Sequence, residues 1–198
     1  MFLLLHVPMM KNIYSRCDRT PATIGYKLIV FLAIVDEIQL VTHLYASIMM
    51  IFNLRTPVAP VLILGAFIDG AWFTTITLTF TITVFRFIVV AVDFLKYYFV
   101  TNIAFFVMTG INLCVFLAFF SLNISGLSRE IFDFSEFGWW YAENCELSDF
   151  MMTIDLWGCS IFYCSSAVIY VLIFVYIFAK RKKNRNNQDI RSALQVRD

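Results

Sequence analysis

The side chains of this sequence that could do chemistry are polar residues lying inside long apolar stretches. Asp36, Gln39 and His43 follow one another at intervals of three and four residues, so on a helix they share one face. Such a face could hold an ion or a proton, or it could hydrogen-bond to a neighbouring helix. The inter-helix hydrogen-bond cluster is the favoured interpretation for this face. Of the three residues, Asp36 is the one most expected to be an exception and to belong to an ion or proton site.

Three further ionisable residues stand out in the other apolar stretches. Seventeen residues separate Asp69 from Arg86, which on a helix is about 25 Å, close to the thickness of a bilayer's hydrocarbon core. Asp69 could contact a ligand from an outward-facing cavity, or it could be a buried acid with partners such as Thr74. Asp155 lies just inside the last apolar stretch and has the same two interpretations. Arg86 would extend its guanidinium to the cytoplasmic surface.

Enzymatic and metal-binding patterns are lacking in the sequence. There are two histidines, His6 and His43, and no metalloprotease, serine-nucleophile or phosphate-binding glycine pattern. The five cysteines show no metal-ligand spacing, and Cys145 is the one expected in an extracellular loop. We therefore expect no catalytic residues, no metal, no cofactor and no nucleic-acid partner.

Four apolar stretches of helix length must position these residues, near 26–52, 61–87, 98–122 and 150–179. A membrane-spanning helix needs about 20 such residues. Apolar residues make up 61% of the chain and charged residues 15%, against roughly 45–50% and 25% in soluble domains, so a lipid bilayer is the expected surrounding.

Residues 75–83 alternate strictly between threonine and apolar side chains, which is the period of a strand and of a membrane β-barrel. A threonine hydroxyl can bond to the carbonyl one turn earlier, and the other stretches are continuously apolar. A helix is therefore expected.

The sequence predicts one all-α membrane domain over residues 1–198, a bundle of four full transmembrane helices with a partial first span before them. Lys180, Arg181, Lys182, Lys183 and Arg185 follow the last span, and such basic flanks stay in the cytoplasm. We therefore expect a multi-pass plasma-membrane protein with a cytoplasmic tail at 180–198 and an acidic outer loop at 123–149. Asn123 begins an Asn-Ile-Ser sequon in that loop, a possible glycosylation site.

The order of these features resembles spans two to five of a seven-span G protein-coupled receptor, and more closely the nematode serpentine chemoreceptors. Residues 26–36 look like the opening of the second span in class T receptors, and residues 65–72, followed after fourteen residues by Arg86, resemble the third span. Phe85-Arg86-Phe87, with Leu95-Lys96-Tyr97 nearby, and residues 140–146 resemble class X patterns.

The resemblance implies an unknown small-molecule ligand on the extracellular side, a cavity lined by Asp69 and Trp72, and Arg86 as a cytoplasmic switch toward a heterotrimeric G protein. The sequence departs from the family at Phe85, which stands where an asparagine or acid is usual. It also departs at residues 184–198, which are polar, whereas a receptor of this family would need its sixth and seventh spans after the fifth. We therefore expect a truncated receptor that does not signal alone. The alternatives are a four-span structural or accessory protein and, more weakly, an ion pathway through Asp36 and His43.

Overall fold

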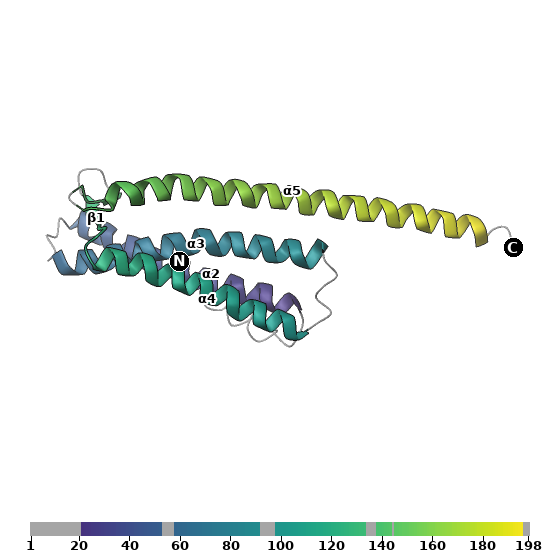
Figure 1. Ribbon diagram of the computed structural model, residues 1–198, viewed down its shortest axis with the longest axis horizontal. Coiled ribbons are helices and arrows are strands. Elements are labelled where there is room, and N and C mark those ends of the chain that lie inside the picture. Colours follow the sequence, from purple (N-terminus) through teal and green to yellow (C-terminus); the bar gives the residue numbers. More distant parts are fainter. Residues whose placement is uncertain (1–20, 53–57, 92–97, 134–137, 144, 196–198) are drawn as a thin grey trace.

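The computed structural model describes residues 21–52, 58–91, 98–133, 138–143 and 145–195, and in these it contains four long helices and one hairpin (Figure 1). The helices are α2 (Pro21–Ile51), α3 (Val58–Ala91), α4 (Tyr98–Ile124) and α5 (Ser148–Gln195). The strands are β1 (Glu130–Asp133) and β2 (Gly138–Tyr141). The partial first span expected before residue 26 falls within 1–20, outside the described residues.

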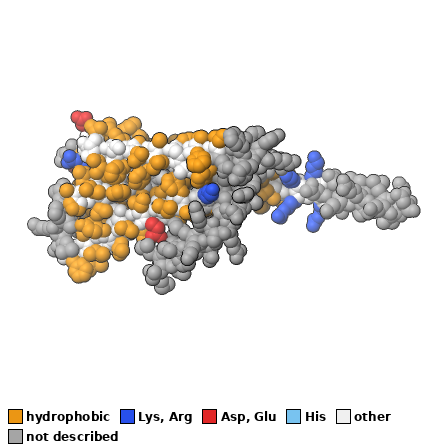
Figure 2. Space-filling view, turned by 90° about the horizontal axis from the view of Figure 1, so that it is seen from below, with side chains coloured by type: hydrophobic (Ala, Val, Ile, Leu, Met, Phe, Trp, Pro, Cys, Tyr) orange, Lys and Arg blue, Asp and Glu red, His pale blue; other side chains and the backbone are white. Residues whose placement is uncertain are grey.

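All four helices are long and apolar enough to cross a membrane. By length and composition the candidate spans are Gly25–Ile51, Ala59–Val90, Phe105–Ile124 and Ser148–Lys183. Large apolar side chains such as Phe106 and Phe174 are 73% and 70% exposed, which is costly in water and favourable in lipid. The surface in Figure 2 is correspondingly apolar over the helices, with Lys and Arg gathered toward the far end of α5. The prediction of a multi-pass helical membrane protein is confirmed to this extent.

Helix α3 occupies the centre of the arrangement. It packs against α2, α4, α5 and β1, with α5 on one side and α2 and α4 on the other (Figure 1). Its buried apolar residues Leu78, Ile82 and Phe85 form a core cluster with Leu28 of α2. Helix α3 is therefore placed to contact every other helix of the bundle.

The threonine-rich segment of α3 is helical, as expected. Hydroxyl groups in and beside this segment donate to the carbonyl oxygen four residues earlier, at 2.7 to 2.9 Å; they belong to Thr74, Thr81 and Thr83. These bonds satisfy the hydroxyls without water, which is why a helix can carry this strand-like pattern inside a membrane.

Phenylalanines join α3 to α4. Phe73 and Phe119 stack with ring centroids 3.8 Å apart, and Phe67 contacts the rings of Phe116 and Phe120. A Cβ atom at Gly70 would lie 3.0 Å from the carbonyl oxygen of Phe116, so glycine lets the two backbones approach closely here.

The outer loop contains strands that the sequence prediction did not include. Within 123–149 the two strands pair antiparallel, with Glu130 opposite Tyr141 and Asp133 opposite Gly138, so the described fold is not wholly α-helical. The chain leaves α4 through Gly126, whose φ of 82° is a left-handed conformation that favours glycine. Helix α5 continues to Gln195, so the described part of the expected tail at 180–198 is helical.

Candidate functional site

Asp69 lies at the centre of a polar cluster beneath the hairpin. We call this end of the bundle the hairpin end. The Asp69 side chain is 1% exposed, and both of its carboxylate oxygens accept hydrogen bonds. The Tyr141 hydroxyl donates to Oδ1 at 2.9 Å, and the Asn123 amide donates to Oδ2 at 3.3 Å. The Asn123 side-chain oxygen accepts from the backbone N–H of Glu130 at 3.2 Å. The cluster thus ties α3, α4 and both strands together.

The hairpin packs on α3 at Gly65, one turn before Asp69, where the backbone of Glu130 approaches the helix. A Cβ atom at Gly65 would collide with the carbonyl oxygen of Glu130, so only glycine allows this contact. The neighbouring Glu130 carboxyl has its Oε2 atom buried with no hydrogen-bond partner among the described residues. Burial, together with the negative charges of Asp69 and Asp155, raises the pKa of Glu130 well above its ordinary value.

The Tyr141 hydroxyl that bonds to Asp69 stays protonated. Burial and the nearby charges of Asp69 and Glu130 raise the pKa of Tyr141 above its usual range. Tyr141 is therefore a permanent donor to Asp69. Because both Asp69 oxygens have partners within the protein, the geometry favours the buried structural acid over direct ligand contact.

Trp72 and Asp155 meet between α3 and α5 at the same end of the bundle. The indole Nε1 donates to Asp155 Oδ1 at 2.6 Å, and the thiol of Cys159 donates to the same oxygen at 3.0 Å. The Trp72 side chain is 39% exposed, in contrast to the enclosed Asp69. Of the three residues expected to contact a ligand, Trp72 and Asp155 form the accessible pair.

The three residues of the expected polar face on α2 are placed differently from one another. Gln39 donates to the Thr75 hydroxyl at 2.9 Å, and that hydroxyl donates to Asp36 at 3.3 Å. Asp36 and Gln39 thus form a hydrogen-bond cluster with α3, which is the favoured interpretation. The His43 side chain is exposed on the helix surface.

The burial of Asn123 conflicts with its expected glycosylation. Its side chain is fully buried, and the amide nitrogen that would carry a glycan donates to Asp69. A sugar could be attached only if Asn123 left this cluster.

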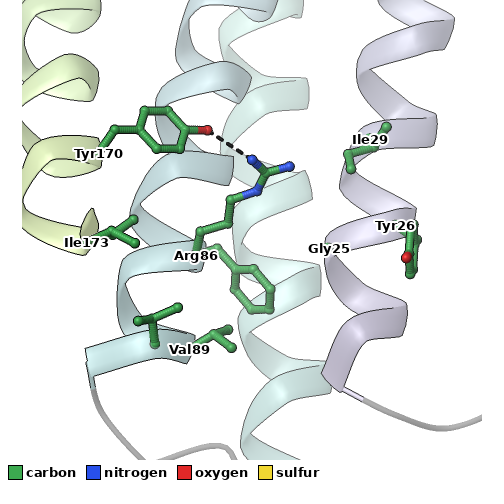
Figure 3. A pocket seen from close by; sticks show the side chains of 9 residues that line it. Gly25, Tyr26, Ile29, Arg86, Val89, Tyr170 and Ile173 are labelled. Carbon is green, nitrogen blue, oxygen red and sulfur yellow. Dashed lines mark hydrogen bonds between the residues drawn. The ribbon is translucent and has the colours of Figure 1, made fainter. Parts of the chain in front are cut away.

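Arg86 lies at the opposite end of the bundle from the hairpin. We call this the basic end, because α5 continues beyond it with the basic segment 180–185. The Arg86 guanidinium donates from Nη1 to the Tyr170 hydroxyl at 3.2 Å. Figure 3 shows Arg86 reaching toward Tyr170 of α5 across a cavity that α2 closes on the other side. The cavity has a volume of about 510 Å³ and is lined mainly by apolar side chains.

Sequence reasoning missed Asn112, the polar residue that fastens α4 to α3. Asn112 is 0% exposed; its side-chain oxygen accepts from Thr77 at 2.9 Å and its amide donates to Thr81 at 3.3 Å. An amide in the middle of an apolar span could have revealed it, since such residues bond across helices in membranes. Tyr141 and Tyr170 gave no comparable signal, because their roles depend on partners 72 and 84 residues away.

The site as a whole is an enclosed acid cluster, an accessible Trp72–Asp155 pair and a separate cavity at Arg86. Among the described residues, no group of three or more His, Cys, Asp or Glu side chains is placed to hold a metal ion. Comparison with known proteins finds no matching family model, curated protein or solved structure.

Proposed function

We propose that this chain is part of a seven-span chemosensory receptor and that it binds a small polar molecule between α3 and α5 at the hairpin end. The observation that carries the proposal is the hydrogen bond between Trp72 and Asp155. It joins a half-exposed indole donor to a carboxylate at the surface of the bundle. Both groups are accessible to a molecule entering between the two helices.

The chemistry of this pair defines the kind of ligand. A ligand hydroxyl or amine could replace the indole N–H on Asp155, and the freed indole could donate to a ligand oxygen. A charge-assisted bond to the carboxylate would give a protonated amine the stronger attachment. We therefore propose small amines and alcohols as the ligand class.

A second polar contact between α3 and α5 supports coupling between ligand binding at Trp72–Asp155 and the position of Arg86. Trp72–Asp155 joins the two helices at the hairpin end, and Arg86–Tyr170 joins them at the basic end. A ligand that separates the first pair would change how α5 lies along α3. Arg86 would then act as the proposed switch toward a heterotrimeric G protein.

Tryptophan fluorescence can test ligand binding without knowledge of the natural ligand. All four tryptophans, Trp72, Trp139, Trp140 and Trp157, belong to the hairpin end. The chain in lipid nanodiscs would be titrated with n-butylamine and n-butanol as probes. We expect a saturable emission change that Asp155→Asn abolishes and that the control Glu143→Gln, an exposed acid near the hairpin, retains. An unchanged emission, or an equal response in Asp155→Asn, would contradict the proposal.

A structural or accessory role is the second candidate. It is favoured by the closed hydrogen bonding of Asp69 and by the exposed apolar faces of α4 and α5, which could pack on helices of another membrane protein. On this alternative, the chain would give no probe response and would migrate in mild detergent as part of a larger defined complex. A monomer with a saturable response supports the receptor instead.

A further inference from the structure

The cavity at the basic end combines an apolar wall with a single cation. Aliphatic side chains from three helices line it, including Ile29 of α2, Val89 of α3 and Ile173 of α5. Arg86 is the charged residue in this lining, and none of the described residues around the cavity is acidic. The hydrogen-bond partner of its guanidinium is the neutral Tyr170 hydroxyl. Among the described residues, the cavity lining therefore presents a positive charge with no acidic side chain beside it, next to an apolar surface.

We propose that this cavity binds one anionic phospholipid, with its phosphate on Arg86 and Tyr170 and an acyl chain along the apolar wall. A guanidinium has five N–H donors in a planar fork that matches phosphate oxygens, and the bond to Tyr170 uses one of them. An arginine near the end of a span extends its guanidinium to the interface, where an anionic lipid phosphate can pair with it. The Tyr170 hydroxyl can turn and donate to the same phosphate.

The depth of the cavity in the membrane fits a headgroup. Gly25 is the first residue of the candidate span in α2, and Val90 is the last of the candidate span in α3; both line the cavity. Arg86 itself lies four residues, about one helical turn, before Val90, near the end of a span where lipid phosphates lie. A soluble anion would not need the apolar wall, whereas a phospholipid uses both parts.

The size and shape of the cavity also fit part of a lipid. Its volume of about 510 Å³ is within the range of roughly 300–1,000 Å³ of sites for small molecules. It can hold a phosphate and the first part of one chain, and the rest of the lipid would remain in the bilayer. Exposed basic residues follow on α5 from Lys180, and they would raise the local concentration of anionic lipid.

Lys27 offers a matched control for the charge of Arg86. It lies at the same end of the bundle, but its ammonium group is directed to α4, 5.5 Å from the centre of the Phe105 ring. Lys27→Gln therefore removes a nearby positive charge without changing the cavity lining. Ile173→Trp does the reverse, because it fills the apolar part of the cavity and keeps the cation.

Native mass spectrometry of the detergent-solubilised chain can measure the affinity of the first bound lipid. The probes would be phosphatidylglycerol, phosphatidylcholine and inorganic phosphate. We expect phosphatidylglycerol to bind more tightly than phosphatidylcholine, and inorganic phosphate not to displace it at millimolar concentration. Arg86→Gln and Ile173→Trp should each weaken phosphatidylglycerol binding about tenfold, and Lys27→Gln by less than about twofold.

Three results would overturn the proposal. The first is an equal loss of lipid in Arg86→Gln and Lys27→Gln, which would mean non-specific attraction. The second is equal binding of the two phospholipids, and the third is displacement by inorganic phosphate, which would assign the site to a free anion. Circular dichroism would check folding, and if Arg86→Gln does not fold, unchanged binding by Ile173→Trp would overturn the proposal.

Discussion

At the scale of single residues, polar side chains inside this bundle are used mainly to join helices. Asn112 joins α4 to α3, and the Thr75 hydroxyl joins α3 to α2 through Asp36 and Gln39. A polar group in lipid must find a partner in the protein, so each of these contacts also fixes how two helices lie together. Enclosed contacts of this kind set the structure, whereas the accessible Trp72–Asp155 pair can exchange partners.

The buried Glu130 carboxyl predicts a stability that falls as the pH rises. Burial and the charges of Asp69 and Asp155 raise its pKa above the ordinary value of 4.5, so the folded chain holds this proton more tightly than the unfolded chain. The stabilisation is fully present below pH 4.5 and is lost as the pH rises through the folded pKa. Glu130→Gln, which stays neutral, should therefore unfold at a higher temperature than the wild type at pH 8, by a margin that shrinks toward pH 5.

Thermal unfolding followed by circular dichroism in detergent micelles would measure this difference. Glu143→Gln is the control, because that acid is exposed near the same hairpin and should leave the pH dependence intact. A pH profile of Glu130→Gln parallel to that of the wild type would show that Glu130 is ionised in the folded chain at all these pH values.

The hydrogen bonds of Asn112 lead us to expect that their loss lowers the free energy of unfolding measurably. Asn112→Leu keeps a similar volume but removes the bonds to Thr77 and Thr81. Inter-helix hydrogen bonds in membranes are worth about 0.6 kcal/mol on average and up to about 1.7, so we expect a loss of about 1 kcal/mol in the free energy of unfolding. Unfolding by SDS in mixed micelles would measure it, with Ile111→Leu on the exposed face as the control. Equal stability of the two variants would contradict the role assigned to Asn112.

At the scale of elements, α3 and the hairpin are held together by a backbone contact at Gly65. A methyl group there would collide with the carbonyl oxygen of Glu130, which cannot move unless the strand moves with it. We expect Gly65→Ala to lift the hairpin from α3, to break the bonds to Asp69 and to cost about 1–3 kcal/mol, as overpacking usually does. Cleavage of the hairpin by a protease should become faster than in the wild type.

Gly110 provides the matched control for this substitution. It is also a glycine within a membrane helix, but a Cβ atom built on it meets nothing within 4 Å. Gly110→Ala should therefore leave both the stability and the cleavage rate nearly unchanged, apart from a small gain in helix propensity. Similar cleavage of Gly65→Ala and Gly110→Ala would mean that the hairpin does not depend on the close approach at Gly65.

The elements differ in how far the sequence predicts them. The four spans follow from length and hydropathy, because the bilayer imposes both; even the alternating threonines of α3 could be interpreted correctly from their local bonding. The hairpin was missed because its strands have four residues each and lie among acids typical of a loop. Gly138 ahead of Trp139, Trp140 and Tyr141 was the available hint, a β-favouring run after a turn residue.

The candidate site was less predictable than the spans. Asp69, Asp155 and Arg86 could be singled out by their cost in an apolar stretch, and Trp72 by the resemblance to the receptor family. Which of them would be enclosed depended on Asn123, Tyr141 and Glu130, which come from the end of α4 and from the hairpin, far along the chain. A sequence shows where a polar group is unusual, but the partner that satisfies it is decided by tertiary packing.

At the scale of the whole molecule, charge distinguishes the two ends of the bundle. The exposed residues Lys180, Arg181, Lys182, Lys183 and Arg185 lie on α5 beyond the other helices (Figure 1), while the hairpin end carries exposed acids such as Glu143, Glu146 and Asp149. Because basic flanks are retained in the cytoplasm, we expect the hairpin end to face the outside of the cell.

Cys145 allows this orientation to be tested in intact cells. It is a free, partly exposed cysteine beside the hairpin, whereas Cys114 and Cys164 lie within candidate spans, which a membrane-impermeant reagent does not enter. If the chain is in the plasma membrane with its C-terminus in the cytoplasm, a membrane-impermeant maleimide should label the wild type before the cells are permeabilised. The Cys145→Ser variant should not be labelled in intact cells. The double variant Cys145→Ser/Arg181→Cys should be labelled at position 181 only after the cells are permeabilised. Labelling of Arg181→Cys in intact cells would instead place the basic end outside, and would remove the basis for Arg86 as a cytoplasmic switch.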